Sequence, residues 1–144
     1  MSSFPPFDDT LNALEASITH EFGTENLFIT EALGRVLAQD IVALENNPTH
    51  ETSSMDGYAI RFCDQPLGAL KLSDFIPAGS ETHGIVQEGE CVKTFTGSLM
   101  SQGSDTLIPI ENVDVKEGIV QIISPVSKGF AVRLVGENYT SGEV

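Results

Sequence analysis

The spacing of apolar residues changes near Pro48 and separates a helical part of the chain from a β-rich part. Asp8 and Asp9 offer acceptors to the first free amides of a helix, and their charge suits its positive end. Gly23 suits the other end. The apolar residues between them fall three or four positions apart, on one helix face: Leu11, Leu14, Ile18 and Phe22. We expect this helix to pack on its own domain or on a second copy of the chain.

The remainder of the helical part carries weaker signals. Thr30 can cap a short second helix through residues 31–33. Val36–Val42 carries the branched residues and the alternation of an extended segment. Pro48 restricts the residue before it and cannot donate an amide, so we place a boundary there. Residues 1–47 should then form a helical arm.

After Pro48 the chain shows short alternating runs separated by glycine turns. These runs predict strands at Tyr58–Phe62, Ala69–Asp74, Cys91–Phe95, Thr106–Ile110, Ile119–Ile123 and Phe130–Val135. Val113–Ile119 predicts a hairpin in which Gly118 supplies the positive φ of a three-residue loop. We expect an α+β, mainly β fold with a β-rich body over residues 48–137. Residues 138–144 close no predicted element, as in a chain that stops inside a larger protein.

Composition narrows the class of protein. The chain has 144 residues, of which 40% are hydrophobic, and this predicts a globular domain. Its net charge of −14, with only 7 Lys and Arg, argues against nucleic acid or anionic membranes as partners, because binding phosphates requires clustered basic residues. The sequence has no apolar run of roughly 18 residues and no basic, apolar leader, so we expect a cytoplasmic protein.

The cysteines and histidines do not form a recognisable site. Cys63 and Cys91 are isolated, which predicts two reduced and mostly buried thiols. His20, His50 and His83 are scattered, which argues against a zinc centre. Phosphate-binding glycine loops and the usual hydrolase signatures are absent from the sequence, which disfavours a self-contained nucleotide enzyme or hydrolase.

The candidate chemistry lies on loops. Asp56-Gly57 suits a tight turn, because Gly57 tolerates positive φ and Asp56 can bond neighbouring backbone. A lone carboxylate would repel an oxyanion by about 4 kcal/mol at about 4 Å, so a cation such as Mg²⁺ is the natural mediator. Ordinary turns are the alternative explanation for these loops. The oxygen-bearing candidates are Ser53, Asp56, Thr96, Ser98, Asp105 and Glu137, the last two better explained as turn-closing residues.

Several segments resemble one family. Ser53–Ala59, with the sequence SSMDGYA, resembles the S-x-M-D-G-Y-A signature of molybdopterin molybdenumtransferases, the MoeA and gephyrin E-domain family of molybdenum insertases. Other segments match the family in the same order: Glu31–Asp40 (E-A-L-G-R-V-L-A-E-D), Thr96–Ser98 (T-G-A), Gly103–Thr106 (G-A-D-T), and Arg133 with Gly136–Asn138 (G-E-D). These matches span nearly the whole chain.

The resemblance implies the N-terminal region of an insertase, with part of the dimerisation domain followed by a coiled, bifurcated β body. It implies help in inserting molybdate into adenylylated molybdopterin with Mg²⁺ and release of AMP. Asp56 and Thr96 would be catalytic, and Asp56 would bind Mg²⁺ or molybdate. The hydroxyl of Thr96 and the amides around Gly97 would donate to an oxyanion. The substrate-binding residues would be Ser53, Met55, Gly97, Ser98 and Glu137, in a cleft completed by the partner subunit of a homodimer.

The chain also departs from the family. Pro48–Ser53 and Thr96–Ser101 differ from the usual P-x-F-D-x-S and T-G-A-P-x-P, and Asn138 replaces an aspartate. The family's α/β pterin-binding domain and C-terminal barrel have no counterpart in this sequence, so we expect the chain alone to be inactive. The alternative is a stand-alone, non-catalytic module for dimerisation or ligand contact. The reading frame after Val144 would distinguish the two.

Overall fold

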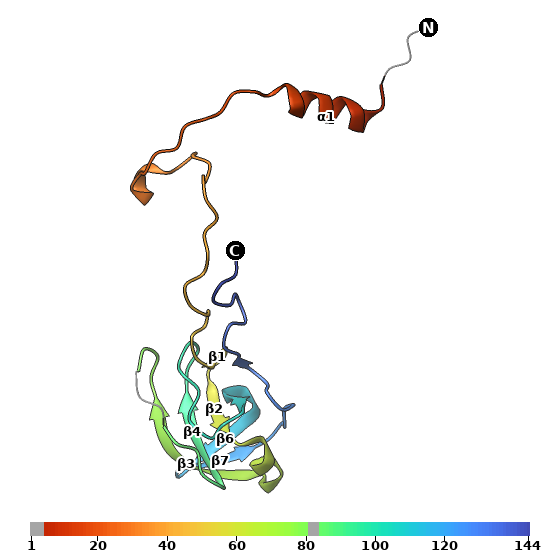
Figure 1. The fold of residues 1–144 in the computed structure, drawn as a ribbon. Helices are drawn as coiled ribbons and strands as arrows, with labels where there is room; N and C mark the ends of the chain where they lie inside the picture. The colour runs from red at the N-terminus through yellow and green to blue at the C-terminus, as the bar shows by residue number, and fades with distance from the viewer. Residues whose placement is uncertain (1–4, 81–83) are drawn as a thin grey trace. The chain divides into compact units, whose positions relative to one another are not determined.

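The computed structural model describes residues 5–80 and 84–144. The chain divides into two compact units, the first ending at Asp40 and the second comprising Ile41–Val144. Figure 1 shows helix α1 in the first unit and the strands in the second. No helix in the described part of the chain is long and apolar enough to cross a membrane.

Helix α1 (Phe7–Ser17) is shorter than the sequence predicts. Asp8 and Asp9 lie in its first turn, but Pro6 is the N-cap and makes no side-chain cap. The helix ends well before Gly23, since Ile18 is already extended. The Ser17 hydroxyl donates to the Leu14 carbonyl at 2.6 Å, and such a bond competes with the continuing helix.

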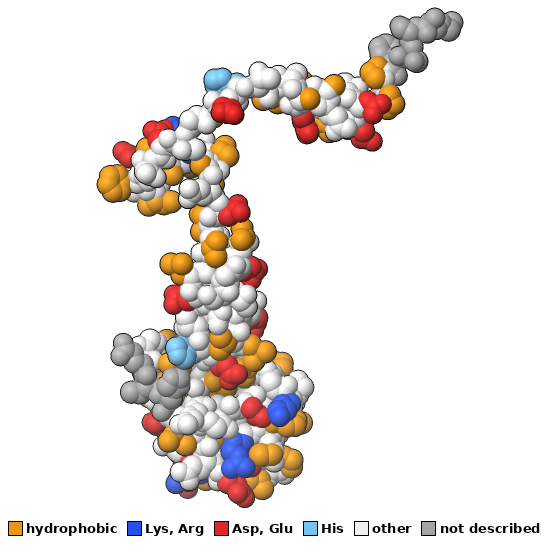
Figure 2. All heavy atoms as spheres, viewed as in Figure 1, with side chains coloured by type: hydrophobic (Ala, Val, Ile, Leu, Met, Phe, Trp, Pro, Cys, Tyr) orange, Lys and Arg blue, Asp and Glu red, His pale blue; other side chains and the backbone are white. Residues whose placement is uncertain are grey.

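The predicted packing of this helix on its own domain is not observed. Helix α1 contains no buried residue, and Figure 2 shows apolar side chains exposed along it. Residues of the predicted stripe range from 41% exposed at Leu11 to 81% exposed at Phe22. The first unit therefore buries none of the residues of this helix.

The second predicted helix is only a 3₁₀ turn, η1 (Ile29–Glu31), with Phe28 rather than Thr30 as its N-cap. Gly34 follows with a φ of 80°, a conformation in which a helix does not continue. Val36–Val42 forms no strand, and the chain bends at residues 38–39. The sequence of this region therefore predicts more regular secondary structure than the chain forms.

The second unit is built from short strands. They are β1 (Thr52–Ser53), β2 (Gly57–Ile60), β3 (Ala69–Ile76), β4 (Glu90–Thr94), β5 (Thr106–Pro109), β6 (Val113–Lys116), β7 (Ile119–Ile122) and β8 (Val132–Arg133), with 3₁₀ turns η2 (Phe62–Leu67) and η3 (Ile110–Asn112). A 6-stranded sheet has the order β5-β2-β4-β3-β7-β6, and β1 pairs with β8. Among the strand pairs of the described residues, β3 and β4 run parallel and the others run antiparallel. Figure 1 shows that the larger sheet is strongly curled.

The alternation of apolar residues explains the core. One cluster buries side chains from five strands of the sheet: Tyr58, Ile60, Leu70, Cys91, Ile108 and Val120. A smaller cluster joins Ile76, Val86 and Val92. Strands β2 and β5 are buried along their whole length. These buried strands hold the turns at their ends in fixed positions.

Each predicted strand has an observed counterpart and β6 forms the first arm of the predicted hairpin, but β1 was not predicted and the strand ends differ. Strand β2 stops at Ile60 because η2 begins at Phe62, whose amide donates to Asp105 Oδ1 at 2.7 Å. The predicted strand at residues 130–135 is only β8, because Ala131 has a φ of 56°. Gly118 has the predicted positive φ, but Glu117 also has one, so the hairpin loop has two residues instead of three.

The final segment does pair with another part of the chain, contrary to the prediction. The Ala43 amide donates to the Glu143 carbonyl, and the Gly142 amide donates to the Ala43 carbonyl, both at 2.8 Å. The Asn47 amide donates to Tyr139 at 2.9 Å. These bonds explain why the second unit begins at Ile41.

The two thiols differ. Cys91 is buried, as predicted, whereas Cys63 is exposed. Strand β4 carries Cys91 into the core, while Cys63 lies on the surface turn η2. His83, the third histidine of the sequence, lies outside the described residues.

Candidate functional site

Asp56 and Thr96 are brought together by the pairing of β2 with β4. Gly57 is opposite Thr94, so the turn before β2 and the turn after β4 meet at one end of the sheet. Asp56 Oδ1 accepts hydrogen bonds from the backbone amide and the hydroxyl of Thr96, both at 2.8 Å. Both residues are exposed. The two residues expected to be catalytic are therefore direct neighbours on the surface.

This contact lowers the pKa of Asp56. The hydrogen bond from the Thr96 backbone amide, followed by that from its hydroxyl, lowers the pKa of Asp56 below its ordinary value of 3.8. Lys93 adds a smaller attraction that also lowers this pKa, against slight desolvation. Asp56 is therefore ionised at neutral pH. Its second oxygen, Oδ2, has no hydrogen-bond partner among the described residues.

Gly57 has a different role from the one predicted. Its φ is not positive, so the turn does not require glycine for that reason. A Cβ at this position would lie 2.3 Å from the carbonyl oxygen of Ile108 on β5. Glycine therefore permits the close approach of β2 and β5 directly beside Asp56.

The amides expected to bind an oxyanion are already occupied. The Thr96 amide donates to Asp56, and the Gly97 amide donates to the Ser53 carbonyl at 2.8 Å. The Ser98 amide donates to the Phe95 carbonyl at 2.9 Å. The prediction of free donors around Gly97 is therefore wrong, and the turn uses its amides to hold its own shape.

Two predicted substrate contacts have buried side chains. Ser53 has no exposed surface, and its hydroxyl bonds both the carbonyl and the amide of Met55. Ser98 is 1% exposed and donates its hydroxyl to the Ile76 carbonyl at 3.3 Å. These hydroxyls do not reach solvent, whereas Met55 is 38% exposed. Of the predicted substrate-binding residues, Met55, Gly97 and Glu137 lie at the surface.

Glu137 and Asp105 both make turn-closing contacts. Glu137 accepts the Leu134 amide at 2.9 Å and lies 3.7 Å from Arg133. Asp105 accepts the Phe62 amide and also lies 3.5 Å from Lys128. Glu137 therefore fixes the backbone of its own loop, whereas Asp105 fixes the start of η2.

Asn138 uses both ends of its amide. Its Nδ2 donates to Asn47 Oδ1 at 2.7 Å, and its Oδ1 accepts from Arg133 at 3.0 Å. An aspartate could not donate to Asn47, because an ionised carboxylate only accepts hydrogen bonds. The exchange of aspartate for asparagine thus provides a link between the segments that begin and end the second unit.

The sequence model of the family described as "MoeA N-terminal region (domain I and II)" matches residues 5–144. This chain belongs to that family. The molybdopterin molybdenumtransferase of Staphylococcus aureus (strain MSSA476) is 33% identical over 122 residues, covering 81% of this chain and 29% of the relative. The enzyme of the same name from Nostoc sp. (strain PCC 7120) is 31% identical over 148 residues, covering 96% of this chain and 34% of the relative.

The fold of this MoeA-family chain matches a known structure. The crystal structure of the molybdopterin biosynthesis MoeA protein from Pyrococcus horikoshii OT3 aligns with a TM-score of 0.84 and 30% sequence identity. The alignment covers 99% of this chain and 39% of that chain. The predicted fold, a helical arm followed by a mainly β body, is therefore confirmed. The chain spans about a third of the length of these relatives.

Sequence reasoning missed a cleft in the MoeA-family β body. It has a volume of about 500 Å³ and is lined by His50, Glu51, residues 100–104 and Val135. The Met100 amide donates to the Glu51 carbonyl at 2.9 Å, which joins the two loops that form its wall. Both loops include positions at which the sequence departs from the family pattern. Those departures could be seen in the sequence, but they did not indicate a concave surface.

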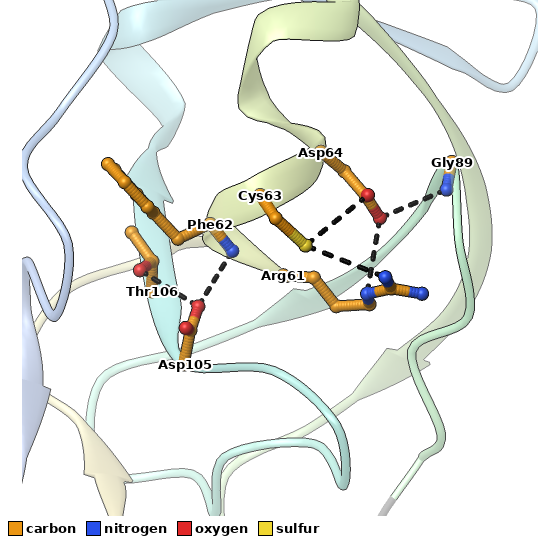
Figure 3. Close-up of polar contacts among 7 residues, drawn as sticks. All are labelled: Arg61, Phe62, Cys63, Asp64, Gly89, Asp105 and Thr106. Carbon is orange, nitrogen blue, oxygen red and sulfur yellow. Dashed lines mark hydrogen bonds and ion pairs between the residues drawn. The ribbon is translucent and has the colours of Figure 1, made fainter.

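A second missed feature is a polar cluster on η2 (Figure 3). Asp64 is 5% exposed, accepts the Gly89 amide at 3.1 Å and lies 3.5 Å from Arg61. Cys63 contacts both Asp64 and Arg61 through its sulfur. This cluster attaches η2 to the turn before β4.

Within residues 5–80 and 84–144, no three His, Cys, Asp or Glu residues group as metal ligands.

Proposed function

We propose that this chain is the N-terminal region of a molybdenum insertase, in which Asp56 and Thr96 border the reaction site. The reaction would insert molybdate into adenylylated molybdopterin and release AMP. The observation that carries this proposal is the exposed Asp56–Thr96 pair in a chain that belongs to the MoeA family. The names of the relatives, molybdopterin molybdenumtransferases, support the choice of substrate.

Asp56 fits a limited role in binding Mg²⁺. It is ionised at neutral pH, and its Oδ2 has no hydrogen-bond partner in the described structure. Mg²⁺ is commonly bound by one or two carboxylates together with waters and substrate phosphates, so a single protein carboxylate is sufficient here. When bound, Mg²⁺ supplies positive charge that reduces the repulsion between two anions. Thr96 keeps the carboxylate charged and oriented.

The rest of the reaction site would come from outside this β body. A substrate site needs convergent groups and enclosing walls, whereas Asp56 and Thr96 lie on an exposed surface. We infer that the pterin-binding walls are supplied by further domains and that the cleft is shared between the subunits of a homodimer. Residues 1–144 alone should then show no insertion activity.

The test is an insertion assay on the polypeptide encoded by the whole reading frame that contains this chain. Purified polypeptide is incubated with adenylylated molybdopterin, with and without molybdate and Mg²⁺, and both AMP and metallated pterin are quantified. We expect AMP release coupled to molybdenum insertion only when both molybdate and Mg²⁺ are present. Residues 1–144 alone serve as the matched inactive control.

The alternative function gives a different result in the same assay. A non-catalytic ligand-contact module would bind adenylylated molybdopterin in calorimetry but release no AMP under any condition. That outcome would overturn the proposal of an insertase. Turnover by residues 1–144 alone would instead show that the β body is a self-sufficient enzyme.

A further inference from the structure

Ser53 connects the two turns that carry Asp56 and Thr96. Its amide donates to the Ser98 carbonyl at 2.9 Å, and its carbonyl accepts the Gly97 amide at 2.8 Å. Its hydroxyl donates to the Met55 carbonyl and accepts the Met55 amide at 3.3 Å. The backbone of Ser53 thus holds the Thr96 turn, and its side chain holds the Asp56 turn.

These contacts form a closed ring. The Ser53 hydroxyl is hydrogen-bonded to Met55, which precedes Asp56 in the chain. Asp56 is hydrogen-bonded to Thr96, and the next residue, Gly97, donates its amide to the Ser53 carbonyl. Side chains of Ser53, Asp56 and Thr96 supply hydrogen bonds to this ring. Because Ser53 is completely buried, water does not replace its hydroxyl from outside. A serine suits this place, since its hydroxyl both donates and accepts in a small volume.

We propose that Ser53 is a positioning residue that fixes Asp56 against Thr96 in the orientation required for insertion. The proposal rests on the proposed function. It gives Ser53 a positioning role in place of the substrate contact that the sequence analysis expected. Ser53 acts through Met55 and the Asp56 turn without touching the reactants. Misplacing a reacting group by about 1 Å can cost about a hundredfold in rate, so a positioning residue has a measurable effect on kcat.

Substitution of Ser53 by alanine separates the role of its hydroxyl from the role of its backbone. Its β1–β8 pairing with Val132 and its bonds to Gly97 and Ser98 use only the backbone, which an alanine retains. Loss of the hydroxyl therefore affects the Met55 contacts selectively. Ser54 is the matched control, because it is exposed in the same turn and its amide bond to the Ala131 carbonyl also survives substitution.

The experiment compares Ser53→Ala and Ser54→Ala in the full reading-frame polypeptide. The first measurement is the NMR chemical shift of the Thr96 amide at one fixed pH, which reports its hydrogen bond to Asp56. The second is kcat and KM for insertion, per folded molecule. We expect Ser53→Ala to change the chemical shift of the Thr96 amide, because the Asp56 turn moves relative to Thr96. We also expect a fall in kcat of about 10- to 100-fold with little change in KM. Ser54→Ala should change neither measurement.

A double-mutant cycle tests whether Ser53 acts through Asp56. In an Asp56→Asn background, Ser53→Ala should cause little further loss of kcat, because coupled residues do not add. An unchanged chemical shift of the Thr96 amide or an unchanged kcat in folded Ser53→Ala would overturn the proposal. If the Thr96 amide shift changes while the unmodified polypeptide shows no insertion, positioning is upheld and the proposed function fails. If Ser53→Ala does not fold, Ser53→Cys takes its place, because a thiol has similar size and weaker hydrogen bonds.

Discussion

At the scale of single residues, two hydrogen bonds from Thr96 lower the pKa of Asp56 and fix the orientation of its carboxylate. Both donors stabilise the ionised carboxylate, and they come from one residue across the sheet. Thr96 therefore acts on Asp56 twice, through a backbone bond that any residue could make and through a hydroxyl bond that needs Ser or Thr. A substitution of Thr96 by alanine removes only the second.

The lowered pKa of Asp56 predicts how this contact depends on pH. A carboxylate with a depressed pKa in the folded state stabilises the fold above its unfolded value of 3.8, and this contribution is lost as pH falls through the folded pKa. The stability difference between the unmodified protein and Asp56→Asn should thus shrink below pH 4. Urea unfolding at several values between about pH 2 and 6 measures this. A difference that grows toward low pH would contradict the lowered pKa.

The different exposure of the two thiols predicts that alkylation will be selective. Cys63 is exposed, whereas Cys91 has no exposed surface and burial, followed by the charge of Glu90, raises its pKa to about 12. Because thiolates are the reactive form, iodoacetamide at neutral pH should modify Cys63 alone. Peptide mass spectrometry identifies the modified residue, and Cys63→Ser should abolish the reaction. Equal modification of Cys91 in folded protein would contradict this burial.

At the scale of elements, Gly57 couples strand packing to the Asp56 turn. Gly57→Ala places a methyl group against the Ile108 carbonyl on β5, so we expect destabilisation of about 1–3 kcal/mol together with displacement of the adjacent turn. Gly97→Ala is the control: no atom lies within 4 Å of its added Cβ, and its φ of 83° should cost only about 1–2 kcal/mol. Thermal unfolding and NMR shifts of Thr96 compare the two variants. A Gly57→Ala variant with unaltered stability and shifts would show that β2 and β5 can separate freely.

Much of the β body could be predicted from sequence, because its strands alternate apolar and polar residues around a buried core. The ends of elements could not. Strand β2 stops where a distant carboxylate, Asp105, accepts the Phe62 amide, and β8 shortens because Ala131 adopts a positive φ. Helix α1 ends early because Ser17 and the residues after it favour other conformations. These outcomes depend on tertiary contacts or on conformations that local propensity does not encode.

The site shows the same division. The motif was sufficient to predict that Asp56 and Thr96 lie in turns next to strands. It could not show that the Gly97 amide is occupied by Ser53 or that Ser53 is buried, because those facts depend on which turns the sheet brings together. The cleft near His50 and Glu51 was also invisible, because a concave surface arises only from the packing of separate loops.

At the scale of the whole molecule, the two units differ in how much they bury. The second unit has an extensive core, whereas helix α1 of the first has none of its residues buried. The hydrogen bonds of residues 43–47 with the final segment belong entirely to the second unit. A fragment of residues 41–144 should therefore fold, with the same near-UV circular dichroism as the full chain. A disordered fragment would show that the first unit is required for folding.

The exposed stripe of α1 predicts self-association. Exposed apolar faces of this kind usually mark an interface, and Leu11 and Leu14 lie on it. Sedimentation across a concentration series should show association of residues 1–144 that is absent from residues 41–144. Leu14→Glu should weaken it, whereas Asn12→Glu, which adds the same charge off the stripe, should not. A strictly monomeric chain at high concentration would exclude this surface as a sufficient interface.

The central claim is that the charge of Asp56 serves insertion, and Asp56→Asn tests it most directly. Asparagine keeps the size of the side chain and an oxygen that can accept both Thr96 bonds, but it removes the charge. The decisive measurement is the insertion rate per folded molecule of the complete polypeptide, with the melting temperature measured on the same sample. We predict a nearly unchanged melting temperature and a rate lower by about a hundredfold, as expected for loss of a charge that helps bind a metal ion. A sharply lower melting temperature with an unchanged rate per folded molecule would show instead that Asp56 only shapes its turn.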